Sequence, residues 1–145
     1  VNNSEEGIAR SYSEEEVCQE IEDQLGVLPV RFGYRPKGMI LQKYCIQDNQ
    51  DIILRYVCEN KKIYIYISKD YDESSINFKM DGEPKDVIQV EALSMEIPVY
   101  EYKDSNENVY MQSSFEYLNT YYSISGMIEQ DEFEKILENI IIKNV

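Results

Sequence analysis

The apolar residues near the start of the chain follow the spacing of a helix. They form one stripe of Val17, Cys18, Ile21 and Leu25. Ser13 and Glu16 match the capping-box pattern, and Gly26 suits the position after the last turn. The sequence therefore predicts a helix between Ser13 and Gly26. Residues 14–16 are glutamates, and we attribute them to stabilisation by the helix dipole rather than to a metal site.

From residue 39 the apolar period changes to two, which is typical of strands. Proline and glycine between Pro29 and Gly38 predict a loop before that point. Alternating runs separated by turn residues predict strands at 39–47, 52–58, 63–68, 76–80, 87–92, 95–103, 109–117 and 120–125. Pro98 lacks the backbone N–H of a central strand, so we expect an edge position or a bulge there.

The turns between the first three strands predict their register. A turn tip at Asn60-Lys61 places Cys58 opposite Ile63, and a tip at Asn49-Gln50 places Cys45 opposite Leu54. One face is then apolar and comprises Met39, Leu41, Cys45, Ile52, Leu54, Tyr56, Cys58, Ile63, Ile65 and Ile67. The opposite face comprises Gln42, Tyr44, Arg55, Val57, Tyr64 and Tyr66. In the last hairpin, one predicted face comprises Met111, Ser113, Phe115, Tyr122 and Ile124.

A second helical stripe closes the chain. Residues 129–143 carry Phe133, Ile136, Leu137, Ile140 and Ile141 on one side. The order of helix, strands and helix predicts an α+β fold. We expect a curved, mostly antiparallel sheet of about six to eight strands, with the N-terminal and the C-terminal helix packed on one face. Residues 1–12 are predicted to be a polar, flexible tether, and residues 13–145 a single domain.

Composition limits the chemistry of this domain. The net charge of −14 disfavours nucleic acid and anionic membrane surfaces as partners. The chain has no histidine, which is the commonest general base and metal ligand. Its three cysteines, Cys18, Cys45 and Cys58, lack the spacing of a zinc site, and we expect them to be reduced, with a buried, hydrophobic role preferred. Two segments that resemble calcium loops, beginning at Asp70 and Asp104, lack the required Gly and Glu and read as hairpin loops.

These absences favour a protein that is not an enzyme and uses no cofactor. The glycines are scattered, so no loop is suited to cradle phosphate, and a Ser or Cys nucleophile would lack its imidazole base. A hydrolase that uses carboxylates alone stays open as an alternative, although 28 acidic residues make chance pairs inevitable.

The 13 tyrosines have two explanations. Tyrosine has a high β-propensity and stiffens an exposed sheet, and it is also enriched on recognition surfaces. Tyr56 and Tyr122 fall on the predicted core faces. A possible contact surface on the other side of the sheet comprises Tyr44, Arg55, Tyr64 and Tyr66.

Several short motifs resemble one known family. They are Leu25-Gly26-Val27, Tyr34-x-Pro36-x-Gly38-Met39, Ile53-Leu54-Arg55-Tyr56 with the strand 62–67, Glu96-Ile97-Pro98-Val99-Tyr100, Tyr121-Tyr122-Ser123-Ile124-Ser125-Gly126, and Glu132-Phe133-Glu134-Lys135-Ile136-Leu137. Their order and spacing over residues 14–143 resemble domain-of-unknown-function family 4367. The resemblance implies a domain of Gram-positive bacteria that follows one membrane-spanning helix, faces the outside of the cell and has no established activity.

Together these features favour an extracytoplasmic binding or sensing domain that is tethered to the membrane and contacts a protein or a small ligand. The start at Val1, without a methionine, agrees with this, because it indicates a fragment whose N-terminus was removed and which a signal or anchor could have preceded, although a cytoplasmic location stays open. The first alternative resembles lipoprotein carriers, which hold a hydrophobic ligand between sheet and helices. The oligomeric state, and the identity of the partner, do not follow from the residues.

Overall fold

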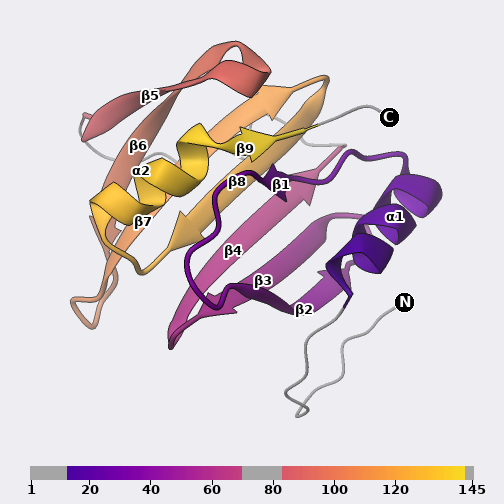
Figure 1. Cartoon of the computed structure of the whole chain (residues 1–145), viewed down its shortest axis with the longest axis horizontal. Helices are drawn as coiled ribbons and strands as arrows, with labels where there is room; N and C mark the ends of the chain where they lie inside the picture. The colour runs from indigo at the N-terminus through magenta and orange to yellow at the C-terminus, as the bar shows by residue number, and fades with distance from the viewer. Residues whose placement is uncertain (1–12, 70–82, 143–145) are drawn as a thin grey trace.

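The computed structural model describes residues 13–69 and 83–142 (Figure 1). The predicted strand at 76–80, the calcium-like segment at Asp70 and the tether at 1–12 lie outside these residues. The elements, in chain order, are α1 (Glu14–Leu25), β1 (Arg31–Phe32), β2 (Ile40–Ile46), β3 (Ile52–Cys58), β4 (Lys61–Ser68), β5 (Asp86–Val90), a short 3₁₀-helix (Glu91–Leu93), β6 (Met95–Lys103), β7 (Val109–Tyr117), β8 (Thr120–Gly126), α2 (Gln130–Glu138) and β9 (Ile140–Ile141).

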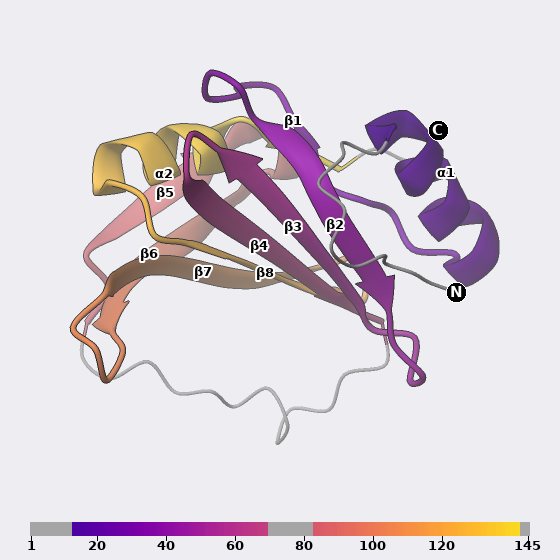
Figure 2. The same cartoon turned by 90° about the horizontal axis from the view of Figure 1, so that it is seen from below.

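The predicted α+β architecture is confirmed. Seven antiparallel strands form one sheet in the order β2-β3-β4-β8-β7-β6-β5, and β1 pairs with β9 in a second, two-stranded sheet. Figure 2 shows a curved large sheet with α1, α2 and β1 on one side of it, and β9 lies beside β1 (Figure 1). We call the sheet surface toward these elements the inner face and the opposite surface the outer face.

Helix α1 begins and ends where the sequence predicts. The Ser13 side chain accepts a hydrogen bond from the backbone N–H of Glu16 at 3.4 Å, which caps the first turn. Gly26 has a left-handed φ of 65°, and its N–H donates to the Glu22 carbonyl at 3.0 Å, which ends the helix. The buried side of α1 faces the large sheet, so these caps fix which residues enter the core.

The inner face of the large sheet carries the main core. Its fully buried members include Leu41, Ile52, Tyr56, Ile63, Ile65, Ile67, Tyr122 and Ile124. The rings of Phe115 and Tyr122, which are cross-strand partners, stack with centroids 5.3 Å apart. The predicted core positions of Tyr56 and Tyr122, and the predicted faces of the β7–β8 hairpin, are therefore confirmed.

The register of β3 against β4 differs from the prediction. Cys58 lies opposite Lys61, and Leu54 opposite Ile65, because Glu59 and Asn60 form the turn. Both turn residues have positive φ, 50° and 66°, as a tight two-residue hairpin turn requires. The partners shift by two residues, so each side chain stays on its predicted face.

The predicted faces of β2 are wrong beyond Gln42. A β-bulge between Leu41 and Lys43 adds one residue, and every later side chain of β2 changes face. Cys45 consequently lies opposite Ile53 and is exposed rather than in the core. Tyr44 lies opposite Leu54 on the inner face, where its hydroxyl donates to a Glu20 carboxylate oxygen on α1 at 3.0 Å.

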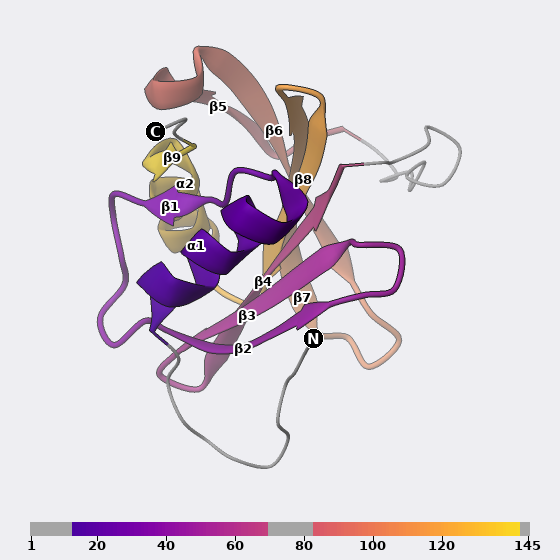
Figure 3. The same ribbon diagram turned by 90° about the vertical axis from the view of Figure 1, so that its right-hand side faces the viewer.

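The C-terminal helix is shorter than predicted. Helix α2 ends at Glu138, and Ile140 and Ile141 form β9 opposite Phe32 and Arg31 of β1. Figures 1 and 3 show β9 lying beside β1, which the sequence predicted as loop. The paired segments are more than one hundred residues apart in the chain, so local spacing could not reveal this pairing.

Pro98 lies in an internal strand, but on a stretch that is paired on one side only. Strand β6 lies between β5 and β7, so it is not an edge strand. However, its ladder with β7 covers only Tyr100–Lys103, and Pro98 is paired with Val87 of β5 alone. Its missing N–H therefore falls where one side of β6 has no strand ladder.

Candidate functional site

The outer face of the large sheet brings together three of the four predicted contact residues. Arg55 on β3 lies directly opposite Tyr64 on β4, and Tyr66 follows two residues later on the same side. Tyr64 is 37% exposed, and Arg55 and Tyr66 are half-buried. Tyr44 does not belong to this group, because the bulge turns it to the inner face.

The charge of this region is opposite to that of the chain. Four adjacent strands, β2, β3, β4 and β8, contain no Asp or Glu. Their register places Lys43, Arg55 and Lys62 on the outer face. Although the chain carries a net charge of −14, the exposed charges of these four strands are therefore cationic, and Asp51, which contacts Tyr66, is buried.

Arg55 is the unusual member of the group. Its Nε atom is buried and has no hydrogen-bond partner, and no carboxylate of residues 13–69 or 83–142 forms an ion pair with it. A buried polar atom without a partner costs about 1–3 kcal/mol, and more when it is charged. The other arginines of the same ranges, Arg31 and Arg35, each pair with a glutamate of α1.

Tyr66 is held more tightly than Tyr64. Its hydroxyl donates a short hydrogen bond to the carboxylate of Asp51, and its ring meets that of Tyr121 edge to face, with centroids 6.1 Å apart. Burial, together with the Asp51 contact, raises the pKa of Tyr66 to about 12. Tyr66 is therefore a neutral, fixed hydrogen-bond donor, and its ring is the part available to a partner.

The centre of the outer face is a neutral hydrogen-bond network. The Gln112 amide donates to Ser114 at 2.9 Å and to Ser123 at 2.7 Å, and the Tyr121 hydroxyl donates to Ser114 at 3.1 Å. Gln112 and Tyr121 are buried. The network spans β7 and β8, so it provides a rigid, uncharged floor beside the cationic strands.

The loop at Asp104 is structural. One oxygen of Asp104 accepts from the backbone N–H groups of Asn106 and Asn108, and the other accepts from the Asn108 amide and the Tyr110 hydroxyl. The Asn108 contacts lower the pKa of the Asp104 carboxyl. Both oxygens are engaged within the β6–β7 hairpin, so the prediction of a hairpin loop at this position is confirmed.

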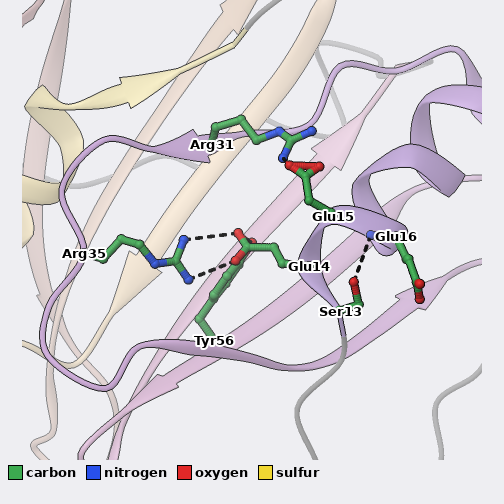
Figure 4. A network of polar contacts seen from close by, with 7 residues as sticks. All are labelled: Ser13, Glu14, Glu15, Glu16, Arg31, Arg35 and Tyr56. Carbon is green, nitrogen blue, oxygen red and sulfur yellow. Dashed lines mark hydrogen bonds and ion pairs between the residues drawn. The ribbon is translucent and has the colours of Figure 1, made fainter.

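On the inner side, the glutamates of α1 make tertiary contacts (Figure 4). Glu14 pairs with Arg35 at 2.9 Å and accepts a hydrogen bond from the Tyr56 hydroxyl at 2.9 Å. Glu15 pairs with Arg31 at 2.7 Å. The helix dipole favours acidic residues in this turn, but these contacts show that two of them also anchor the helix to β1, β3 and the following loop.

A cavity of about 470 Å³ opens at the rim between the β3–β4 turn and the start of α2. Its carboxylates are Glu59, Glu129, Asp131 and Glu132. Glu132 accepts a hydrogen bond from the Tyr34 hydroxyl at 2.7 Å, and the Lys135 ammonium lies 4.9 Å from the centroid of the Tyr34 ring. Because Glu132 has this structural role, the cavity offers weaker support for a site than the outer face.

Two absences apply to residues 13–69 and 83–142, the part of the chain that the structure describes. No group of three or more His, Cys, Asp or Glu side chains there could hold a metal ion. No helix in these ranges is long and apolar enough to cross a membrane.

The geometry of the sheet could be anticipated in part. Strict alternation placed Arg55, Tyr64 and Tyr66 on one face, whereas Lys43 and Lys62 were not singled out. Their signal was the complete absence of acids from four predicted strands of a strongly acidic chain.

No curated protein and no solved structure matches the chain. The model of a family described as a domain of unknown function matches residues 29–140, which include the whole seven-stranded sheet and α2. The chain belongs to domain-of-unknown-function family 4367.

Proposed function

We propose that this domain is a non-enzymatic binding module and that the outer face of its sheet contacts a partner through Arg55, Tyr64 and Tyr66. The observation that carries the proposal is the half-buried Arg55, which has no ion pair within the described residues. High β-propensity alone explains tyrosines on a sheet, but it does not explain an arginine held at a cost in desolvation. A ligand that pairs with the guanidinium would offset that cost.

The absence of histidine supports a role other than catalysis, because the commonest general base is missing from the whole chain. The family resemblance supports a bacterial, extracytoplasmic domain tethered to the membrane by an upstream segment. The partner in this proposal is a protein or a small ligand rather than nucleic acid.

The two alternatives have less support. A lipid carrier needs space between sheet and helices, but there Ile21, Phe133, Ile136 and Leu137 are buried in the same core cluster as the inner-face side chains. A hydrolase that uses carboxylates alone would place its acids in the rim cavity, where Glu132 is engaged by Tyr34. Neither alternative accounts for Arg55.

The proposal is tested in the full-length protein in its own cells. A photo-cross-linking amino acid replaces Tyr64 in one variant and Leu118 in a control variant. Leu118 is 61% exposed at the turn between β7 and β8, away from Arg55. We expect a discrete cross-linked product from position 64 only, and its loss when Arg55→Ala is added.

Products of equal yield from both positions, or none from position 64, would contradict the proposal. Retention of the product in the Arg55→Ala background would exclude Arg55 from the contact. The circular dichroism spectrum and the unfolding midpoint of each variant show whether it is folded.

A further inference from the structure

We propose that the ligand of the outer face is a short acidic peptide segment, which lies across β2, β3, β4 and β8 and places a carboxylate against Arg55. This inference rests on the proposed function and specifies the chemistry of the partner.

The acids of the two helices and the cations of β2–β4 lie on opposite sides of the large sheet (Figure 2). The acids of the helices are Glu14, Glu15, Glu16, Glu20, Glu22 and Asp23 on α1, and Asp131, Glu132, Glu134 and Glu138 on α2. Both helices lie on the inner side of the sheet (Figure 2). Strands β2–β4 carry Lys43, Arg55 and Lys62 on the outer side and no acid of their own, while Asp51, just before β3, is buried against Tyr66. At physiological ionic strength charges are screened beyond about 8 Å, so a ligand on this face responds to these cations more than to the distant helices.

The register aligns the key side chains in one row. Lys43 lies opposite Arg55, Arg55 opposite Tyr64, and Tyr64 opposite Ser125. Adjacent strands are about 4.8 Å apart, so the row is about 14 Å long. An extended peptide rises about 3.4 Å per residue, so about four residues would span the row. The row therefore fits a short, extended segment that crosses the strands.

The groups along the row suit a carboxylate and a peptide backbone. A guanidinium binds a carboxylate through two parallel hydrogen bonds, and the guanidinium of Arg55 forms no ion pair with a carboxylate of the described residues. Tyr64 contributes an exposed ring and hydroxyl beside it. The Ser125 hydroxyl continues the row with a group that can donate to or accept from a peptide amide.

A long polyanion fits this face less well than a short peptide. The outer side of β2–β4 offers three cations, whereas a polyanion that binds through its charge uses about 6–10 such contacts. A polymer that extends past the row would also meet the remaining surface of a chain with net charge −14. One or two carboxylates satisfy Arg55 and Lys43 without that repulsion.

The test uses nuclear magnetic resonance of the ¹⁵N-labelled protein. The probe is a blocked five-residue Ser-Glu-Ser-Glu-Ser peptide, and its matched controls replace both glutamates by glutamine or by lysine. We expect the Glu peptide alone to shift the backbone amide signals of β2, β3, β4 and β8, and its affinity to fall as salt is raised to about 0.5 M.

Variants locate the contact. Arg55→Gln is expected to weaken the Glu peptide about tenfold, because a charge-assisted, two-bond contact is lost. Lys43→Gln and Lys62→Gln change solvent-accessible residues of the same face and are each expected to weaken it about two- to threefold. Lys103→Gln is the control, since Lys103 is an exposed cation paired with Glu107 at the end of β6, and the affinity should not change.

Each other outcome overturns the inference. These outcomes are equal binding of the Gln and Glu peptides, no shift of the outer-face signals by the Glu peptide, and tighter binding of an oligothymidylate to this face. If position 64 still forms its cross-link in cells, the proposed function stands and only the ligand chemistry is wrong. If the cross-link and the peptide contact are both absent, the proposed function fails as well.

Discussion

The hydroxyl of Tyr56, on the inner face of β3, donates a hydrogen bond to the carboxylate of Glu14 on α1 at 2.9 Å. The same carboxylate accepts from Arg35 at 2.9 and 3.3 Å. Tyr56 is 1% exposed, and burial, with the charge of Glu14, raises the pKa of its hydroxyl. One side chain of the core thus holds the first turn of α1 against the sheet.

Replacing Tyr56 by Phe is expected to lower the free energy of unfolding by about 1.5 kcal/mol, because a buried hydrogen bond to a charged group is lost. Urea unfolding followed by circular dichroism measures this loss. Tyr34→Phe is the control, since the Tyr34 hydroxyl also donates to a carboxylate but lies at the half-exposed rim. An equal or larger loss in the control would show that the Tyr56 contact has no special role in stability.

The three cysteines are expected to differ in reactivity. Cys45 is exposed on the outer face, whereas Cys18 and Cys58 are buried. Burial raises the pKa of the Cys18 thiol to about 11 and also raises that of Cys58. At a pH of about 8, a thiol-reactive dye should therefore modify Cys45 rapidly, and Cys18 and Cys58 only after unfolding. Peptide mapping of the labelled protein, with Cys45→Ser as control, identifies the site; rapid labelling of that variant would contradict the expectation.

Glu134 on α2 links stability to pH. Burial is the main cause that raises its pKa, and a hydrogen bond and like-charge repulsion with Asp86 on β5 add to it. A carboxyl whose pKa is higher in the folded than in the unfolded state binds its proton more tightly on folding. Its favourable contribution is therefore present below the unfolded pKa of about 4.3 and is lost as pH rises through the folded-state pKa.

Glu134→Gln mimics the protonated acid, so we expect it to stabilise the fold at neutral pH by about 0.3 kcal/mol, a small effect because solvent screens the pair. The advantage should disappear near pH 4, where the native carboxyl is itself protonated. Unfolding by urea at both pH values measures the difference. A stabilisation that is independent of pH would exclude the proposed titration, and Glu138→Gln, at an exposed position of the same helix, is the control.

The alternation of residues carried most of the fold. A period of two identified the seven strands of the large sheet, because half-buried strands alternate apolar and polar residues. Apolar stripes at helical spacing identified both helices. The choice of Asn60-Lys61 as a turn was wrong by one residue, yet the face of every side chain in β4 was right, since the partners moved by two. At Gln42 the bulge adds one residue, so Tyr44 lies on the inner face and not on the outer face that was predicted for it.

For the candidate site, the sequence predicted which side chains share a face but not their contacts. Arg55 and Tyr64 share a face because both follow the period of their strands, which the sequence displays. The lack of an ion pair to Arg55 depends on where every described carboxylate lies in the fold, and no local pattern reports that. The pairing of β1 with β9 was hidden for the same reason, since it joins two-residue strands from opposite ends of the domain.

A close backbone contact adjoins the β1–β9 pair. The backbone N–H of Gly33 donates to the carbonyl of Asn139 at 2.8 Å, just beyond the β1–β9 ladder. A Cβ atom at position 33 would lie 2.9 Å from this carbonyl oxygen, closer than real contacts allow. Gly33→Ala must therefore push β1 away from β9, and we expect a loss of about 1–3 kcal/mol in the free energy of unfolding.

Hydrogen exchange of the backbone amide at position 33 measures the effect locally, and urea unfolding measures it for the whole domain. Ile140→Ala is a second variant that should loosen the same pair of strands, because the native Ile140 side chain on β9 is fully buried. The Gly33 amide should lose protection from exchange in this variant as well. Ser105→Ala, in the exposed loop after β6, is the control and should change neither quantity. A Gly33→Ala protein with the same free energy of unfolding as the native protein would contradict this prediction. It would show that a Cβ atom fits beside the carbonyl oxygen of Asn139 and that the close contact is not needed to keep β1 and β9 together.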